Sequence, residues 1–523
     1  MKKIYSKNIY IIFLFIFAFL LNFYVSNQGV LPIDTFLHYD SASRILSGSL
    51  PIRDYWVVHG ISLDYIQAIF FFIFGINWFS YILHSSVFNA LISITTFIYL
   101  FKNGLKKEFC LILSISFSIL AYPISGTPFL DQHAVFFCLL GFYFLHFGLK
   151  INTKYLFFLP IFFGLAFLSK PVPSVYLILV LSFSFIFFIF TSKKFELIKY
   201  PFLGSVFFLS VFIIFIYVQK IDFDMFFTQL IYYPISIGGE RLSSLNINFE
   251  KIFSNYKFII LPLIISLFLL KGTSKKIKKK NKIFYFFVFI IFNCTCIYHQ
   301  LLTKNQNFIF FLIPINLAFL ILFLEDKFKN KKNKTKLKRF LILIFLFCIF
   351  VTSKYHLRFN VDRKFHDLQN TSLDNSINSK KIHPSLSPLK WKTPNFEDPK
   401  KEILMINKIL KELEKNEKNI MLITNYNFIS SISSKRIYTI SRTYDDISFP
   451  DKRNKYYQKF KNFFVNKIQK NDISVIYLVF DKDILEYSTN RYVYEYFNSK
   501  CFNSETINDN LIRLDIKNCK QFK

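Results

Sequence analysis

The strongest constraint on this chain is a series of separated apolar blocks, most of them about 15 to 20 residues long, near the length that a helix needs to cross a bilayer. Of its 523 residues, 53% are hydrophobic and 20% aromatic, and the blocks collect this content. Soluble domains do not gather their apolar residues in this way. The sequence therefore predicts a mainly α, polytopic membrane protein with about eleven spans, at residues 9–25, 80–101, 108–123, 132–149, 155–169, 174–192, 200–218, 257–270, 283–298, 307–324 and 340–353.

Charged loops between these spans predict the orientation of the chain. Four lysine-rich loops alternate with four loops that carry acidic residues, Pro and Gly. Short basic loops stay in the cytoplasm by the positive-inside rule, so an odd number of spans places the N-terminus inside and residues 354–523 outside. The basic loops are 102–107, 193–199, 271–282 and 325–339, and the outer loops are 26–79, 124–131, 219–256 and 299–306.

Two segments leave alternatives open. Residues 1–7 are basic, as in a signal peptide, but no small-residue cleavage site follows, which favours an uncleaved anchor in the inner or plasma membrane. Residues 61–76 are apolar but short, which favours a helix lying on the membrane surface. If that helix crossed the membrane instead, every later loop would change sides.

The net charge of +32 would also suit nucleic acid. Much of this charge sits in the basic loops beside spans, where it orients the chain, and a lysine-rich composition is also typical of low-GC coding sequences. The sequence therefore excludes nucleic acid as an expected partner.

The expected domains are a transmembrane domain at 1–353, which includes the first outer loop at 26–79, a linker at 354–398, and a soluble, extracytoplasmic α/β domain at 399–523. In the last of these, helical patterns at 399–417 and 453–469 accompany strand-like runs. These runs are at 420–424, 437–440, 474–480 and 511–516. Cys501 and Cys519 could pair if this domain lies outside, and the sequence leaves their pairing open.

Polar side chains at the ends of the spans are site candidates, because such groups are costly beside lipid unless they have a function. Each has a simpler reading. Asp34 and Asp131 could be helix caps, Lys170 could extend its amine from a helix end to the membrane surface, and the histidines could only make local hydrogen bonds.

The residues Asp34, Ala42, Arg44-Ile-Leu46, Gly48, Pro51-Ile-Arg-Asp-Tyr55 and Phe74-Gly75 resemble the first extracytoplasmic loop of GT-C glycosyltransferases. That superfamily includes the protein O-mannosyltransferases, the aminoarabinose lipid A transferases and the rhizobial lipopolysaccharide galacturonosyltransferases. Its members often have two adjacent acids where this chain has Asp34-Thr35. The resemblance covers residues 9–320 best and extends loosely to the soluble C-terminal domain.

The resemblance implies transfer of a sugar from a polyprenyl-phosphate donor to an acceptor glycan, lipid or protein at the outer face of the membrane, with inversion. It implies that Asp34 is the catalytic base, and Lys170 and Arg241 suit the donor phosphate. Asp131 would bind the donor or hold Lys170 in place. No metal-ligand pattern or definite cofactor is found, and a divalent metal is left open. Supporting roles are expected for Arg53, Asp54, His59, His133, Lys304 and Gln306.

Two other classes of function compete with this interpretation. A transporter or flippase of lipid-linked sugars would also need cations facing a polyprenyl phosphate, but transporters tend to have repeated halves and charges near the middle of the membrane. A polymerase or ligase of lipid-linked glycans would have arginines in its outer loops. Neither class predicts Asp34 in the first loop together with a large soluble tail.

Overall fold

The computed structural model describes residues 2–243, 245, 247–270, 277–303, 308–328, 334–517 and 519. They form two compact units, each made of three stretches of the chain. The helices α5 (Trp78–Lys102), α10 (Lys199–Val218) and α12 (Tyr233–Ser243) continue from one unit into the other. The first unit is Met1–Asn27, Ile82–Phe212 and Arg241–Asn370, and the second is Gln28–Tyr81, Ile213–Glu240 and Thr371–Lys523.

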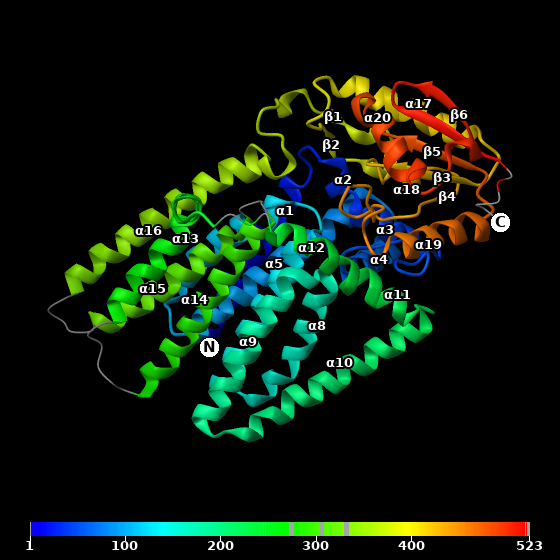
Figure 1. Cartoon of the computed structure of the whole chain (residues 1–523). Helices are drawn as coiled ribbons and strands as arrows, with labels where there is room; N and C mark the ends of the chain where they lie inside the picture. The colour runs from blue at the N-terminus through cyan, green and yellow to red at the C-terminus, as the bar shows by residue number, and fades with distance from the viewer. Residues whose placement is uncertain are drawn as a thin grey trace. The chain divides into compact units, whose positions relative to one another are not determined.

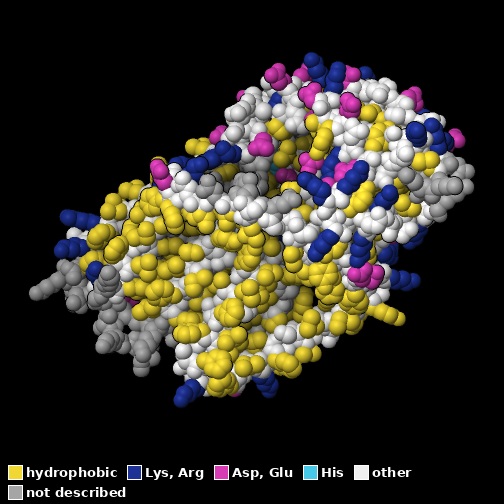
Figure 2. Space-filling view, viewed as in Figure 1, with side chains coloured by type: hydrophobic (Ala, Val, Ile, Leu, Met, Phe, Trp, Pro, Cys, Tyr) yellow, Lys and Arg dark blue, Asp and Glu magenta, His cyan; other side chains and the backbone are white. Residues whose placement is uncertain are grey.

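Ten helices among the described residues are long and apolar enough to cross a membrane, which confirms ten of the eleven expected spans. Figure 2 shows hydrophobic side chains covering the flanks of the helices, with Lys and Arg gathered near several helix ends. The ten are Asn8–Val25, Trp78–Lys102, Lys107–Ile124, Leu130–Lys150, Pro171–Ser192, Phe195–Val218, Phe249–Leu270, Lys282–Leu302, Phe308–Lys327 and Lys334–His366.

The eleventh expected span, 155–169, falls on the shorter apolar segment Thr153–Ser169. This segment consists of a 3₁₀ helix, η2 (Thr153–Phe158), followed by α8 (Leu159–Ser169). Asp131 lies at the start of α7 (Leu130–Lys150), and Lys170 follows α8, yet their side chains are hydrogen-bonded at 2.6 Å. The segment therefore returns along the length of α7, although it is too short to count among the ten long helices.

The first unit is a helical bundle, in which α7 packs against α8 and α9, α9 against α14, and α6 against α1, α15 and α16. Figure 1 draws these helices from blue to yellow-green. Its elements besides those already given are α1 (Lys2–Val25), α6 (Lys107–Leu120), η1 (Tyr122–Ile124), α9 (Pro171–Ser192), η3 (Phe195–Ile198), α13 (Phe249–Leu270), α14 (Ile277–Leu302), η5 (Phe308–Phe311), α15 (Leu312–Lys327), α16 (Lys334–His356), η7 (Leu357–Val361) and η8 (Lys364–His366).

Buried asparagines link these helices. Asn22 on α1 donates to the hydroxyl oxygens of Ser85 and Ser86 on α5 at 3.0 and 3.1 Å. Asn89 donates to the carbonyl oxygens of α1 and α6, and Asn316 on α15 donates to Asn293 on α14 at 3.0 Å. Amides hold helices together in lipid because an unpaired polar group there is costly.

The second unit combines the first outer loop with the C-terminal segment. Its five-stranded sheet has the order β4-β3-β5-β7-β6, with β4, β3 and β5 parallel and the other pairs antiparallel. Its elements are α2 (Pro32–Thr35), α3 (Leu37–Leu46), α4 (Ser62–Phe74), α11 (Phe223–Phe227), η4 (Thr228–Tyr232), η9 (Leu373–Asn375), β1 (Ile377–Asn378), η10 (Ser379–Lys381), η11 (Pro384–Leu386), β2 (Lys390–Trp391), α17 (Pro399–Lys415), β3 (Ile420–Thr424), α18 (Ile429–Ile432), β4 (Ile437–Tyr438), α19 (Tyr457–Lys470), β5 (Val475–Val479), α20 (Lys482–Thr489), η12 (Asn490–Tyr494), η13 (Ser499–Cys501), β6 (Phe502–Asn508) and β7 (Leu511–Ile516).

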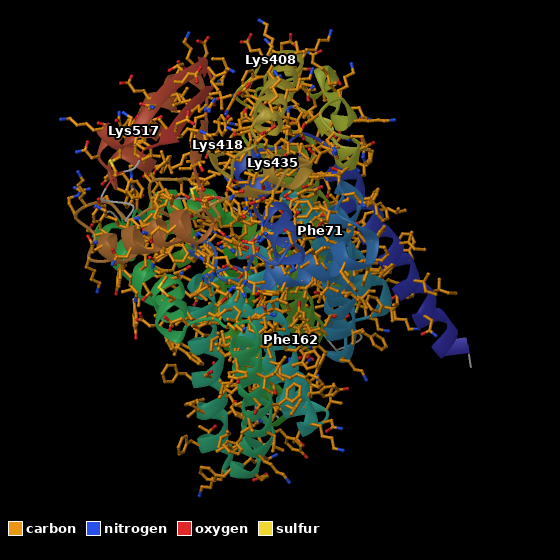
Figure 3. The ribbon with its side chains drawn as sticks, turned by 90° about the vertical axis from the view of Figure 1, so that its right-hand side faces the viewer. Phe71, Phe162, Lys408, Lys418, Lys435 and Lys517 are labelled. Atoms are coloured by element: carbon orange, nitrogen blue, oxygen red, sulfur yellow. A yellow bond between two sulfur atoms is a disulfide. The ribbon has the colours of Figure 1, made fainter. Side chains whose placement is uncertain are left out.

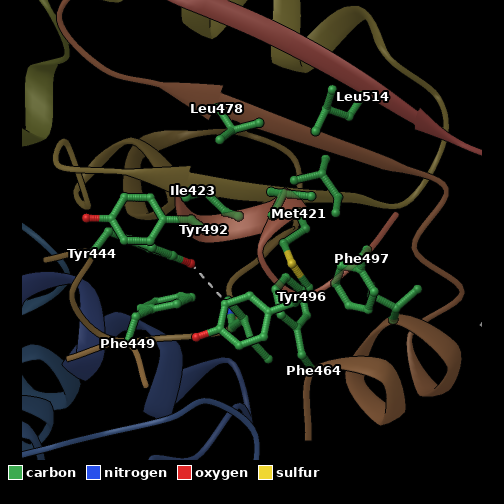
Figure 4. Close-up of a cluster of buried hydrophobic side chains, with 14 of the residues drawn as sticks. Met421, Ile423, Tyr444, Phe449, Phe464, Leu478, Tyr492, Tyr496, Phe497 and Leu514 are labelled. Atoms are coloured by element: carbon green, nitrogen blue, oxygen red, sulfur yellow. Dashed lines mark hydrogen bonds between the residues drawn. The ribbon is translucent and has the colours of Figure 1, made fainter. Parts of the chain in front are cut away.

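A core of aromatic and aliphatic side chains lies on one face of this sheet (Figure 4). Trp56 from the first outer loop belongs to this core and packs edge-on against Phe460 of α19. The backbone of Trp56 also pairs with the C-terminal segment, since its N–H donates to Ile440 O at 2.8 Å and its carbonyl oxygen accepts from the Arg442 N–H at 3.0 Å. The loop therefore contributes both a side chain and a strand-like edge to the C-terminal domain.

Most predicted elements of the tail are confirmed. The runs 420–424 and 511–516 coincide with β3 and β7, and the predicted helices correspond to α17 and α19. The sequence analysis missed α20 and β6, and it treated as linker a stretch that contains β1 and β2. Cys501 and Cys519 form a disulfide. The predicted domain boundaries stay predictions, because compactness does not test which parts fold independently.

The predicted surface helix at 61–76 is α4, which ends before Gly75. Its buried residues recur at helical spacing and include Asp64, Gln67 and Phe71. The opposite face exposes Ile69, Phe72 and Ile73, the second of them by 79%. An apolar face of this kind suits contact with lipid.

Replacing Gly204 by Ala should destabilise the first unit. A Cβ at Gly204 on α10 would overlap the carbonyl oxygen of Phe157, a backbone atom that cannot move aside by rotation. We expect the change to cost about 1–3 kcal/mol and to lower the melting temperature of the purified protein. Gly239→Ala is the control, because nothing lies within 4 Å of its Cβ position. Equal melting temperatures for the two variants would contradict this packing.

Candidate functional site

The main site candidate in the first unit is an ion pair at the ends of three helices. Lys170 Nζ donates to Asp131 Oδ2 at 2.6 Å, and His299 Nε2 on α14 lies 3.8 Å from Asp131 Oδ1. The side chains of Lys170 and Asp131 are 18% and 7% exposed. Asp131 is in the first turn of α7, where the helix dipole favours a carboxylate. The pair therefore presents a partly accessible ammonium group whose position Asp131 fixes.

The geometry of Lys170 suits an anion. An ammonium group has three N–H donors, and Asp131 uses one of them. The main chain at Lys170 is extended, between the end of α8 and Pro171 at the start of α9, so its amine is held near Asp131 by both helices. A phosphate oxygen at the remaining donors would gain a charge-assisted hydrogen bond.

His133 lies two residues after Asp131 on α7, in a buried network. Its Nδ1 bonds the Tyr122 hydroxyl, and its Nε2 lies 3.1 Å from His84 Nε2. Its ring stacks on Phe88, with ring centroids 4.1 Å apart. Only one of the two facing Nε2 atoms can carry the shared proton, so each imidazole constrains the tautomer of the other. The expected supporting role of His133 stays a prediction.

Asp34 lies in the short helix α2, and the elements on both sides of it are held in place. Before it, Gly29 and Val30 donate from their backbone to the carbonyl oxygens of Lys390 and Lys392. After it, the Phe36 ring packs against Trp391 and Phe428, with centroid distances of 6.0 and 4.4 Å. Asp34 itself is half-buried. The C-terminal segment thus positions the residue that the resemblance assigns as base.

A buried carboxylate supports that arrangement. Glu402 accepts hydrogen bonds from Trp391 Nε1 at 2.7 Å, Thr393 Oγ1 at 2.8 Å and the Tyr426 hydroxyl at 2.9 Å. Burial raises the pKa of Glu402 to about 7, against the lowering effect of these three donors. Because Trp391 and Thr393 flank the backbone that pairs with residues 29 and 30, Glu402 fixes the edge against which the Asp34 segment lies.

Asp64 joins the first outer loop to the C-terminal segment through a fully buried cluster. Arg442 Nη1 donates to Asp64 Oδ2 at 2.8 Å and to Gly60 O at 2.9 Å, and His38 Nδ1 bonds Asp64 Oδ1 at 2.6 Å. Burial tends to raise the pKa of Asp64, but the charge of Arg442 and the hydrogen bonds from His38 and Arg442 together outweigh this effect and hold that pKa below 3.8. Burial lowers the pKa of His38 below 6.5, although Asp64 opposes this. At neutral pH, therefore, Asp64 is ionised against Arg442 and His38 is neutral.

Arg53 and Asp54 form a second contact between the same segments. Arg53 Nε donates to Asp54 Oδ2 at 2.7 Å, and Lys467 Nζ on α19 donates to Asp54 Oδ1 at 3.1 Å. In α3, Arg44 Nε donates to Asp40 Oδ2 at 2.7 Å and its Nη2 donates to Ser430 Oγ at 3.0 Å. Asp54, for which the sequence predicted a supporting role, and Asp40 thus make contacts between these segments.

Several predicted residues cannot be placed in this way. Lys304 and Gln306 lie outside the described residues, as does the side chain of Arg241. His59 is half-buried in the turn before α4. Among the described residues, no group of three His, Cys, Asp or Glu side chains could hold a metal ion. The roles of all these residues stay predictions.

Sequence reasoning missed three residues that support the candidate sites: Arg442, Glu402 and His299. Arg442 and Glu402 carry no local signal, because an Arg in a loop or a Glu in the first turn of an amphipathic helix is ordinary. The sequence analysis assigned His299 no role. The signal that could have found it is its place at the end of an apolar block, matching Lys170 at the end of another.

Comparison with known proteins gives a family match over part of the chain. Residues 58–217 match the family model described as dolichyl-phosphate-mannose-protein mannosyltransferase. No curated protein matches the chain. The matched stretch contains Asp131 and Lys170 but neither Asp34 nor Arg241. It confirms the predicted resemblance to GT-C glycosyltransferases for the part of the chain that carries the ion pair.

Two solved structures are similar to the whole chain. The crystal structure of ArnT from Cupriavidus metallidurans in the apo state has 11% sequence identity, covers 96% of this chain and 97% of its own, and has a TM-score of 0.46. The crystal structure of the same protein bound to undecaprenyl phosphate has 10% identity, covers 97% of both chains, and has a TM-score of 0.48. No role of any residue follows from a similarity at this level.

Removing both members of the Asp131–Lys170 pair should destabilise the protein by less than the sum of the two single removals. A single Lys170→Met or Asp131→Asn change leaves a mostly buried charged or polar partner, at a cost of about 3–5 kcal/mol. The double variant should cost less than the sum of the two, which a double-mutant cycle on unfolding free energies measures. Lys154→Met, at an exposed position, is the control. Strict additivity would show that the two side chains are not coupled.

His38 should make the stability of the protein depend on pH. Because the folded state lowers the pKa of His38, the unfolded chain binds more protons below about pH 6.5, and the free energy of unfolding should fall as the pH drops below that value. Asp64 keeps its charge over this range because its pKa is also lowered. The melting temperature of the His38→Asn variant should differ less between pH 7.5 and pH 5.5 than that of the unchanged protein. Identical differences for the two proteins would refute the assignment.

Proposed function

We propose that this protein is a multi-pass inner- or plasma-membrane glycosyltransferase that moves a sugar from a polyprenyl-phosphate donor to an acceptor glycan, lipid or protein at the outer face. The observation that carries the proposal is the Asp131–Lys170 pair within the segment that matches the mannosyltransferase family model. A second support is the crystal structure of ArnT with undecaprenyl phosphate, a lipid phosphate of the proposed donor class. This support concerns the chemical class of the ligand alone.

In the proposed reaction, an acceptor hydroxyl attacks the anomeric carbon from the side opposite the phosphate. A new C–O bond forms, the bond between the anomeric carbon and the phosphate oxygen breaks, and its electron pair stays with the phosphate. The configuration at the anomeric carbon is inverted. The proton of the acceptor hydroxyl passes to the Asp34 carboxylate, which acts as general base.

Lys170 is proposed to stabilise the negative charge that develops during the reaction. As the glycosidic bond lengthens, negative charge grows on the phosphate, and a preplaced ammonium group lowers the energy of that state. Asp131 orients this ammonium group without occupying all its donors. Arg241 is proposed as a second, bidentate phosphate ligand. No strong acid is needed, because a phosphate is already a good leaving group.

The orientation is part of the proposal. The lysine-rich loops place the N-terminus in the cytoplasm and residues 354–523 outside. The Cys501–Cys519 disulfide supports this placement of the tail, since disulfides persist in oxidising compartments. The exposed apolar face of α4 fits a helix lying on the outer membrane surface beside the segment that carries Asp34.

Asp34→Asn should abolish transfer while donor binding survives. Loss of a general base typically lowers the rate by about 100- to 10,000-fold, and the amide keeps the size of the side chain. The measurement is label transfer from polyprenyl-phosphate sugars to cell-envelope glycans and lipids, in membranes of a deletion strain complemented with each variant. Asp374→Asn, which changes an exposed acid of the second unit, is the control. Full transfer by the Asp34 variant would remove Asp34 from the catalytic role.

A further inference from the structure

The second unit contains a polar cavity of about 560 Å³ that the proposed reaction does not use. Its lining comes from residues 43–54 of the first outer loop and from two parts of the C-terminal segment, 430–439 and 470–471. The volume is in the range of sites that bind small molecules. Lys435, one of the lining residues, is labelled beside Lys418 in Figure 3, and its Nζ donates to Lys418 O at 2.6 Å.

The cavity is strongly cationic. Its lining holds Arg44, Arg53, Lys435, Arg436 and Lys470 against a single acid, Asp54. Arg53 and Lys467 already neutralise Asp54. Arg44 is paired with Asp40.

Arg436 and Lys470 are left for a ligand, whereas Lys435 Nζ donates to the carbonyl oxygens of Asn416 and Lys418. No carboxylate among the described residues lies within ion-pair distance of Lys435, Arg436 or Lys470. Arg436 and Lys470 are exposed, so their charges are available at the cavity. A group of unpaired cations in a concavity attracts anions.

The remaining lining suits a sugar. Hydroxyl groups from the loop and from residues 430–439 supply donors and acceptors that can match those of a saccharide. The Tyr438 ring lies under the Arg436 guanidinium, 5.1 Å from its centroid, and adds a flat surface of the kind on which sugar rings pack. Eight Ser and Thr residues of the lining carry hydroxyls: Ser43, Ser47, Ser49, Ser430, Ser431, Ser433, Ser434 and Thr439.

We infer that this cavity binds an anionic saccharide, one that carries phosphate or carboxylate groups, as the recognition element of the acceptor. The identification of this saccharide as part of the acceptor rests on the proposed function, whereas its binding to the cavity does not. The donor is assigned to the Lys170 site in the first unit, so the cavity would give the enzyme a separate means of choosing what it glycosylates. Its cations make that choice dependent on the charge of the acceptor.

The test is direct binding to the full-length protein in nanodiscs. Glucose 6-phosphate and glucuronate should bind, glucose should bind at least about 10-fold more weakly, and added salt should weaken the anionic sugars. Inorganic phosphate separates a saccharide site from a simple anion site, and it should bind more weakly than glucose 6-phosphate. Lipid A included in the nanodiscs should compete with glucose 6-phosphate if the saccharide is lipid-borne, and should leave its binding unchanged if it is water-soluble. Either result supports binding at the cavity and shows whether the saccharide is lipid-borne or water-soluble.

The Arg436→Gln, Lys470→Gln double variant removes two unpaired cations from the cavity. It should raise the dissociation constant for glucose 6-phosphate by about 10-fold or more. Lys408→Gln, Lys517→Gln is the matched control, because it removes the same charge from exposed residues of the same unit that do not line the cavity (Figure 3). This control should bind within about two-fold of the unchanged protein, since distant exposed charges are screened.

Two outcomes would overturn the inference: equal binding by the cavity variant and its control, or binding of glucose as tight as that of the anionic sugars. The proposed function fails separately. Asp34→Asn should bind glucose 6-phosphate normally. If the unchanged protein binds anionic sugars at the cavity but transfers no sugar, the binding inference is supported and the proposed glycosyltransferase function is contradicted. In a transfer assay the cavity variant should raise the KM for the acceptor and leave kcat unchanged.

Discussion

The ion pair between Arg442 and Asp64 is the contact on which the second unit depends. The two residues are 378 positions apart in sequence, their atoms are 2.8 Å apart, and their side chains are 2% and 0% exposed. A carboxylate taken out of water at this depth is tolerated only beside an opposite charge with its remaining lone pairs satisfied. The first outer loop can therefore reach its native fold only together with the C-terminal segment. The neighbouring pairing of Trp56 with Ile440 and Arg442 builds on the same contact.

In the first unit, too, buried polar groups need partners, but here amide groups as well as charges supply them. Its asparagines are paired between helices, which is the arrangement expected where no water is available. Lys170 and Asp131 differ from them in keeping some exposure and in having a donor capacity that the pair does not exhaust. Complete burial, as at Asp64, indicates a structural role, whereas spare donor capacity at an accessible helix end indicates a binding role. This contrast is the physical reason for preferring Lys170 to the other buried cations as a phosphate ligand.

Local signals in the sequence predicted the elements well. The apolar blocks gave ten long helices, and continuous β-type runs such as 420–424 and 511–516 became strands at the same residues. β6 was missed because its sequence, Phe502–Asn508, is largely polar and forms an exposed edge with little apolar alternation. α20 was missed because it is short. For the site, the sequence singled out Asp131 and Lys170 and gave their pairing as one of two alternatives. It did not predict Arg442 and Glu402, whose roles depend on contacts between distant segments that no local pattern reveals.

The first outer loop connects the two proposed roles of the second unit. Asp34 precedes α3, while Arg44, at its far end, lines the cationic cavity. A helix of 10 residues is about 15 Å long, and α3 lies in the sequence between the proposed base and the last turn that lines the cavity. An acceptor bound through its anionic group at the cavity would have to extend along α3 to present a hydroxyl at Asp34. On this proposal α3, held through Asp40 and Arg44 to Ser430, would set the distance between the recognised group and the glycosylated one.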